Sequence, residues 1–133
     1  MFTLRRETDY AIQLLKTLGK DPNQVKSLNE IARETKISFL FLQKIARKLR
    51  LAKLIKAHQG VEGGYSLQID PHKTSLKNII EAMEGKCSIL ACLDENKEVK
   101  CCVDKKKCPL RTKMSKVNKE IIKTLEKIKL SDV

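Results

Sequence analysis

Two short helical segments joined by a tight break constrain most strongly what this chain can fold into. Residues Ser27 to Glu30 have the form of a capping box, which predicts a helix that begins at Ser27. After a break at Thr35, Ser38 can cap a second helix that runs to about Leu51. Two short helices connected in this way are typical of a helix-turn-helix.

The second of these helices is expected to be basic on its exposed face. Leu42, Ile45 and Leu49 recur at helical spacing and predict a buried face. The opposite face would carry Gln43, Lys44, Arg47, Lys48 and Arg50. An ordinary helical pair with a solvated Lys/Arg face is the alternative. We favour a DNA-reading helix, because the next segment completes a larger unit.

That next segment is predicted to be a β-hairpin. Residues 54–58 and 65–69 have the pattern of two strands, and a turn-forming stretch with three glycines lies between them. A hairpin after a helix-turn-helix is a wing, and glycines let its backbone approach another surface closely. The candidate DNA contacts are Ser38, Phe39, Leu40, Gln43, Lys44, Arg47, Lys48, Arg50, Gln59, Gly60, Gly63 and Gly64.

The composition agrees with a nucleic-acid-binding protein of about one domain. The chain has 133 residues, of which 41% are hydrophobic, and a formal net charge of +12. Such a charge favours polyanions or anionic membrane surfaces. The N-terminus lacks the apolar stretch of a secretory signal, and no transmembrane run is evident, so a cytoplasmic protein is expected. We expect a winged domain at 1–75, followed by a cysteine loop and dimerisation helices at 76–133.

All five cysteines fall within residues 87–108, which predicts a thiol site on a loop. The spacing lacks a Cys-x2-Cys pair, which weakens the case for a zinc ribbon. Cys108 precedes Pro109 and should lie at a helix N-terminus, where the helix dipole stabilises a thiolate. An iron–sulfur cluster or zinc is favoured over reduced structural thiols or a disulfide formed on oxidation.

The last helix is expected to begin at Pro109, a residue tolerated in the first turn. Its apolar residues follow at spacings of four or three, close to a coiled-coil seam. They are Leu110, Met114, Val117, Ile121, Leu125 and Ile128. Packing on the chain's own domain is the alternative, but we prefer a homodimer, because the helix is longer than a winged unit needs.

In these features the chain resembles the bacterial winged-helix regulators typified by the iron–sulfur cluster regulator, the nitric-oxide-sensing repressor and the cysteine-metabolism repressor. The resemblance covers nearly the whole chain. The matching stretches are Thr8–Ala11, Ile37–Leu42, Lys48–Arg50, Leu54-Ile55, Gly63-Gly64-Tyr65 with Leu67, Ile79–Ala82 before Glu84-Gly85, and Cys108-Pro109-Leu110. The Gly-Gly-Tyr wing combined with later cysteines is the most specific of these.

The resemblance implies a mainly α-helical homodimer with a small β-hairpin wing and a long C-terminal dimerisation helix, reading a partly palindromic promoter site. In cluster-binding members three loop cysteines bind the cluster, which here implies Cys92, Cys102 and Cys108. Cys101 can substitute for Cys102, and Cys87 is extra. Asp9 matches the acidic fourth ligand of the nitric-oxide sensors, which reaches across the dimer.

This chain departs from the family pattern at three positions. Arg111 replaces the histidine ligand of the iron–sulfur cluster regulator, Gln59 replaces a common wing arginine, and Met114 replaces an aromatic.

The expected function is therefore a DNA-binding transcriptional regulator, a repressor, controlled by an iron–sulfur cluster of two or four irons that senses iron, redox state or nitric oxide. A cluster-free thiol or zinc sensor of the same fold is the alternative. RNA binding is disfavoured, since aromatic residues are only 4% of the chain. The recognition helix and wing disfavour an electron-transfer protein. No nucleophile–base constellation predicts an enzyme, and neither a membrane nor a small-molecule substrate is expected.

Overall fold

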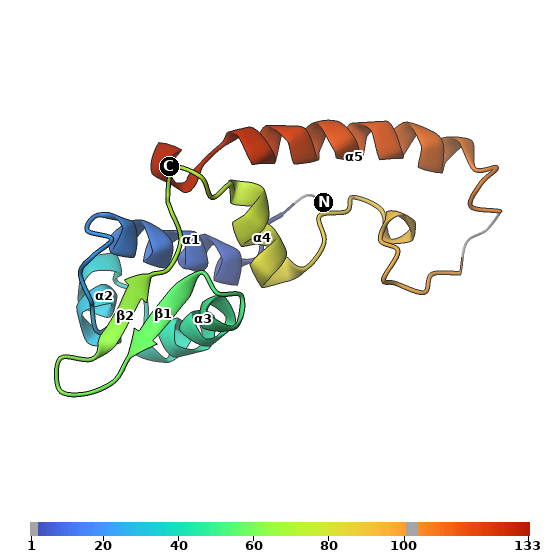
Figure 1. The fold of residues 1–133 in the computed structure, drawn as a ribbon. Helices are drawn as coiled ribbons and strands as arrows, with labels where there is room; N and C mark the ends of the chain where they lie inside the picture. Colours follow the sequence, from blue (N-terminus) through green and yellow to red (C-terminus); the bar gives the residue numbers. More distant parts are fainter. Residues whose placement is uncertain (1–2, 101–103) are drawn as a thin grey trace.

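The computed structural model describes residues 3–100 and 104–133, and it is mainly helical (Figure 1). The elements in order are α1 (Arg6–Gly19), α2 (Leu28–Thr35), α3 (Phe39–Leu51), β1 (Ile55–His58), β2 (Gly64–Leu67), α4 (Leu76–Glu84), the 3-10 turn η1 (Ala91–Leu93), α5 (Pro109–Lys127) and the 3-10 turn η2 (Leu130–Asp132). Within the described ranges no helix is both long and apolar enough to cross a membrane.

Side-chain caps define the helix-turn-helix as the sequence predicts. The Ser27 side chain accepts a hydrogen bond from the Glu30 N–H at 3.2 Å, and the Glu30 carboxylate accepts one from the Ser27 N–H at 3.3 Å. Lys36 ends α2 in the left-handed conformation, with φ of 59°. Ser38 then accepts from the Phe41 N–H at 3.3 Å and starts α3. The tight turn is thus a left-handed residue followed at once by a new cap.

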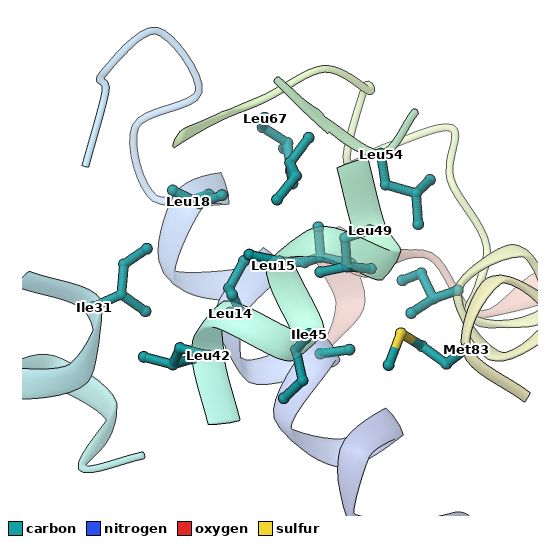
Figure 2. Close-up of a cluster of buried hydrophobic side chains, with 14 of the residues drawn as sticks. Leu14, Leu15, Leu18, Ile31, Leu42, Ile45, Leu49, Leu54, Leu67 and Met83 are labelled. Carbon is teal, nitrogen blue, oxygen red and sulfur yellow. The ribbon is translucent and has the colours of Figure 1, made fainter. Parts of the chain in front are cut away.

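One apolar core joins α1 to the elements around it. Leu14, Leu15 and Leu18 of α1 are essentially fully buried, and they face the buried side of α3 and the wing (Figure 2). The predicted buried face of α3 is confirmed, since its four apolar positions have no exposed surface. They are Leu42, Ile45, Ala46 and Leu49. Helix α4 contributes Ile79 and Met83 to the same core, so burial fixes the orientation of α3.

The wing is a two-stranded antiparallel hairpin, in which Ile55 pairs with Leu67 and His58 with Gly64. The strands are slightly shorter than predicted, since β1 begins at Ile55 and β2 ends at Leu67. Lys26, in the segment before α2, pairs with the outer edge of β2. The Lys26 N–H donates to the Tyr65 carbonyl at 2.9 Å, and the Tyr65 N–H donates to the Lys26 carbonyl at 2.8 Å. The base of the wing is therefore attached to the helix-turn-helix.

Helix α5 lies across the top of the molecule, and the cysteine segment extends from its far end (Figure 1). The chain just beyond the C-terminal end of the helix is attached to the core: Leu130 is buried, and the Leu76 N–H donates to the Ile128 carbonyl at 2.9 Å. Within α5 itself, which is described throughout, no side chain is buried. Its apolar stripe stays largely exposed, with Leu110 61% and Val117 46% exposed.

Gly64→Ala is expected to destabilise the fold. A Cβ at this position would collide with the Lys26 carbonyl oxygen, a backbone atom whose movement would disrupt the pairing of Lys26 with Tyr65. We expect a loss of about 1–3 kcal/mol in the free energy of unfolding, measured by urea denaturation. Gly19→Ala is the control, since a Cβ there would meet only ordinary contacts at 3.9 Å. Equal stability of the two variants would contradict this account.

Candidate nucleic-acid interface and thiol site

The outer face of α3 combines polar and apolar exposed side chains. Gln43, Arg47 and Arg50 are exposed. At the start of the helix, Leu40 is 76% and Phe39 39% exposed. Ser38, which the sequence suggested as a DNA contact, uses its hydroxyl to cap the helix. This face therefore presents a short apolar end followed by hydrogen-bonding and cationic side chains, the groups that read base edges and phosphates.

Two of the predicted lysine contacts are not free in this structure. The Glu7 carboxylate, from the first turn of α1, accepts from Lys44 Nζ at 2.6 Å and from Lys48 Nζ at 2.7 Å. Hydrogen bonds from these two lysines lower the pKa of Glu7 to about 2. Lys48 is half-buried, whereas the sequence pattern placed it on the exposed face. Glu7 lies 37 residues before Lys44, so no local signal identified it.

The wing glycines have a different role from the one the sequence suggested. Gly63 and Gly64 approach the chain's own backbone: a Cβ on Gly63 would lie 2.6 Å from the His58 carbonyl oxygen, and one on Gly64 would meet Lys26. Gly60 alone of these three has open space around it, with φ of 107°. The interpretation that all three glycines permit approach to another surface is thus replaced at two positions by tight internal packing.

Arg111, in the first turn of α5, makes hydrogen bonds to both Cys92 and Cys108. Cys108 is the N-cap of the helix, and its Sγ accepts from the Arg111 N–H at 3.5 Å. The Arg111 Nε donates to the Cys92 carbonyl at 3.4 Å, which holds η1 against the helix. Both cysteines are half-buried free thiols. The surroundings are electropositive, since they combine a helix N-terminus and the Arg111 guanidinium with the lysines that precede Cys108.

Of the remaining proposed ligands, the structure describes only Asp9. Cys101 and Cys102 lie outside the described residues. Asp9 is exposed on α1. Among the residues that are described, no three His, Cys, Asp or Glu side chains form a group that could hold a metal ion.

Cys87 occupies separate surroundings at the end of α4. Its N–H donates to Glu81 Oε1 at 3.4 Å, and its carbonyl accepts from the Asn118 side chain at 3.4 Å. Burial, reinforced by the negative charge of Glu81, raises the pKa of the Cys87 thiol. This cysteine therefore lies in different electrostatic surroundings from Cys108.

The end of α4 also fixes the start of α1. Glu84, the last residue of α4, accepts from the Arg5 N–H at 2.8 Å and from the Thr8 hydroxyl at 2.5 Å. Thr8 is fully buried. The cysteine segment begins immediately beyond Glu84, so this carboxylate joins that segment to the helix that carries Glu7.

Residues 4–133, almost the whole chain, match the Rrf2 family, which is described as iron-dependent transcriptional regulators. The chain belongs to the Rrf2 family. The resemblance inferred from the sequence is confirmed, as is the winged-helix fold. Rrf2 proteins are transcriptional regulators and not enzymes, and membership implies DNA binding.

Relatives named for different regulators match this Rrf2 protein. The transcriptional regulator NsrR of Shouchella clausii is 24% identical over 127 residues, covering 95% of this chain and 84% of the relative. CymR of Bacillus subtilis is 33% identical over 89 residues, covering 67% of this chain and 62% of the relative. The solved structure of CymR, described as the global cysteine regulator of B. subtilis, aligns with a TM-score of 0.77 at 25% identity, covering 99% of this chain and 95% of that one.

The position of Cys87 predicts slow thiol chemistry. Because burial and Glu81 raise its pKa, less thiolate is present at neutral pH, and iodoacetamide should alkylate Cys87 severalfold more slowly than an unperturbed cysteine. The rate should rise as pH increases toward the raised pKa. Glu81→Gln removes the neighbouring charge and should accelerate alkylation, as measured by mass spectrometry of the labelled peptide. An alkylation rate equal to that of a model thiol at neutral pH would contradict the buried position.

Proposed function

We propose that this Rrf2 protein is a homodimeric repressor of promoter DNA whose binding is controlled by an iron–sulfur cluster held by Cys92, Cys102 and Cys108. The observation that carries the cluster proposal is the convergence of Cys92 and Cys108 on Arg111 at the start of α5. Asp9 of the partner subunit is proposed as the fourth ligand, and Cys101 as the substitute for Cys102.

DNA would be bound by the outer face of α3 together with the wing. Gln43, which is exposed, would contact base edges, while Arg47 and Arg50 would contact bases or phosphates. Phe39 and Leu40 offer apolar contacts suited to thymine methyl groups. At the wing, the exposed residues Gln59 and Gly60 would approach the backbone or the minor groove. Gly63 and Gly64 contribute by shaping the hairpin.

Dimerisation would use the apolar stripe of α5. A helix with exposed Leu110, Val117 and Ile121 leaves a continuous apolar surface in water, which a second copy of the same helix would cover. The stripe has the spacing of a coiled-coil seam. Pairing two winged units in this way would present two recognition helices to a partly palindromic site.

The donor set and its surroundings fit a thiolate-bound cluster. Thiolates are the usual ligands of iron–sulfur clusters, and Cys108 lies at a helix N-terminus, where the partial positive charge would attract the anionic cluster. When bound, the cluster would supply sensitivity to iron supply, oxidants or nitric oxide. The chain's own residues hold the loop in place: Arg111 fastens the Cys92 turn to α5 by its guanidinium.

A physical route from the cysteine segment to the DNA-reading helix supports the proposal of control. Glu84 precedes the segment and holds the first turn of α1. That turn carries Glu7, which holds Lys44 and Lys48 of α3. A displacement of the cysteine segment would therefore shift α3 through the Glu84 carboxylate, helix α1 and the Glu7 carboxylate.

A cluster-free thiol or zinc sensor of the same fold is the second candidate. It is favoured by the 33% identity to CymR, whose solved structure is described as that of a global cysteine regulator. In that case Cys92 and Cys108 would respond to oxidation or bind zinc, with the same effect on α5.

The DNA interface is tested by two substitutions on α3. Gln43→Ala should change base preference at one position, at a cost of about 1–3 kcal/mol in binding free energy. Arg47→Ala should weaken all sequences about equally and reduce the salt slope by roughly one. Selection of bound duplexes from a random library, followed by salt titration, measures both. Unaltered affinity and preference in both variants would exclude α3 as the reading element.

The dimer is tested by Ile121→Asp, which places a charge on the apolar stripe. An unpaired charge buried at an interface is strongly disfavoured, so sedimentation should show monomers and palindrome binding should be lost. Lys119→Asp, exposed on the other side of α5, is the control and should remain dimeric. A dimeric Ile121→Asp protein would place the interface elsewhere.

The cluster is tested by cysteine substitutions in anaerobically purified protein. Cys92→Ala, Cys102→Ala and Cys108→Ala should each abolish the iron chromophore, because three thiolates hold the cluster. Cys87→Ala should retain it, and Asp9→Ala should leave a labile cluster. Iron and sulfide analysis accompanies the absorption spectrum. Protein that contains zinc and no iron, or a chromophore that survives every single cysteine substitution, would favour the second candidate.

A further inference from the structure

The Glu7 carboxylate lies against α3, where it pairs with two lysines that the sequence suggested as DNA contacts. It brings a negative charge to the one helix expected to meet DNA phosphates, and that helix contains no acid of its own. Oε1 accepts from Lys44 and Oε2 from Lys48, so the carboxylate uses both oxygens. The two lysines are four residues apart and lie on one face of α3.

These lysines are accessible enough for DNA to reach them. The Lys44 side chain is 59% exposed and that of Lys48 37%, against 23% for Glu7. A phosphate oxygen binds a lysine ammonium through the same charge-assisted hydrogen bond that a carboxylate makes. Because each ammonium already lies 2.6–2.7 Å from a Glu7 oxygen, a phosphate must displace that oxygen or share the ammonium with it.

We propose that Glu7 is an internal competitor of the DNA backbone, which occupies Lys44 and Lys48 and thereby limits the affinity of the recognition helix for phosphate. This inference rests on the proposed DNA-binding role of α3. Glu7, which lies on α1 outside the helix-turn-helix, would lower the affinity for DNA of any sequence. Glu7 would not alter base preference, which depends on exposed side chains of α3 such as Gln43.

The competitor is held in place by the rest of the fold. Its helix turn is fixed by Glu84, which accepts from the Arg5 N–H and the Thr8 hydroxyl. One turn further along, Tyr10 packs edge-to-face on Phe41 of α3, with ring centroids 5.9 Å apart. The backbone that carries Glu7 is therefore held beside α3, which keeps the carboxylate within reach of both lysines.

Glu7→Gln tests the proposal, since glutamine has nearly the same size and removes only the charge. Binding to a duplex of mixed sequence is measured by fluorescence anisotropy across a salt titration. The variant should bind on the order of tenfold more tightly at low salt, and the slope of log K against log salt should steepen by about one to two, because each freed lysine can neutralise one phosphate. The gain should vanish when Lys44 and Lys48 are both replaced by Met.

Glu126→Gln is the matched control for net charge. Like Glu7, Glu126 forms an ion pair with a lysine: its carboxylate lies 3.2 Å from Lys77 of α4. Glu126 itself is on α5, at the opposite side of the molecule from α3 (Figure 1). It should leave affinity close to wild type. An equal gain in both variants, or wild-type or weaker binding by Glu7→Gln, would overturn the competitor. A wild-type protein that binds no duplex, or binding unaffected by Arg47→Ala, would instead overturn the DNA-binding role of α3.

Discussion

The buried face of α1 is the constraint on which the other elements depend. Leu14, Leu15 and Leu18 are essentially without exposed surface and lie between the helix-turn-helix, the wing and α4. A close-packed core of this kind tolerates little relative movement, because displaced side chains lose contacts on every side. The position of α3, and therefore of any DNA-reading side chain, is set by burial against α1 and not by the turn between α2 and α3 alone.

The same helix carries the charges that connect the two halves of the chain. The first turn of α1 is not capped by its N-cap residue, since the Arg5 side chain has no hydrogen-bond acceptor. Glu84, at the end of α4, accepts instead from the Arg5 N–H and the Thr8 hydroxyl, and Glu7 extends from the same turn to α3. Surface ion pairs contribute little to stability. The Glu7 pairs therefore matter more for the electrostatic field that DNA meets than for the folding free energy.

The three described thiols divide between two environments although they share one segment. Cys108 accepts an N–H at a helix start, and Cys92 is held beside it by Arg111. Cys87 lies near Glu81, and burial raises its pKa. The contrast separates Cys87 from the two cysteines that Arg111 contacts.

Local signals in the sequence determined most of the architecture. The side chains of Ser27 and Ser38 define helix starts through hydrogen bonds to N–H groups three residues on, and Pro109 suits a first helical position because it has no N–H and a fixed φ. These signals are local, so the residues themselves predict them. The buried face of α3 and the hairpin after it follow from periodicity in the same way. Only the tertiary structure decided the rest. Glu7 meets Lys44 across 37 residues, Glu84 meets Thr8 across 76, and Gly64 is required by the Lys26 backbone of another segment. Contacts between segments so far apart leave no periodic or local mark in a single sequence, because they depend on how the buried faces of different helices settle against one another.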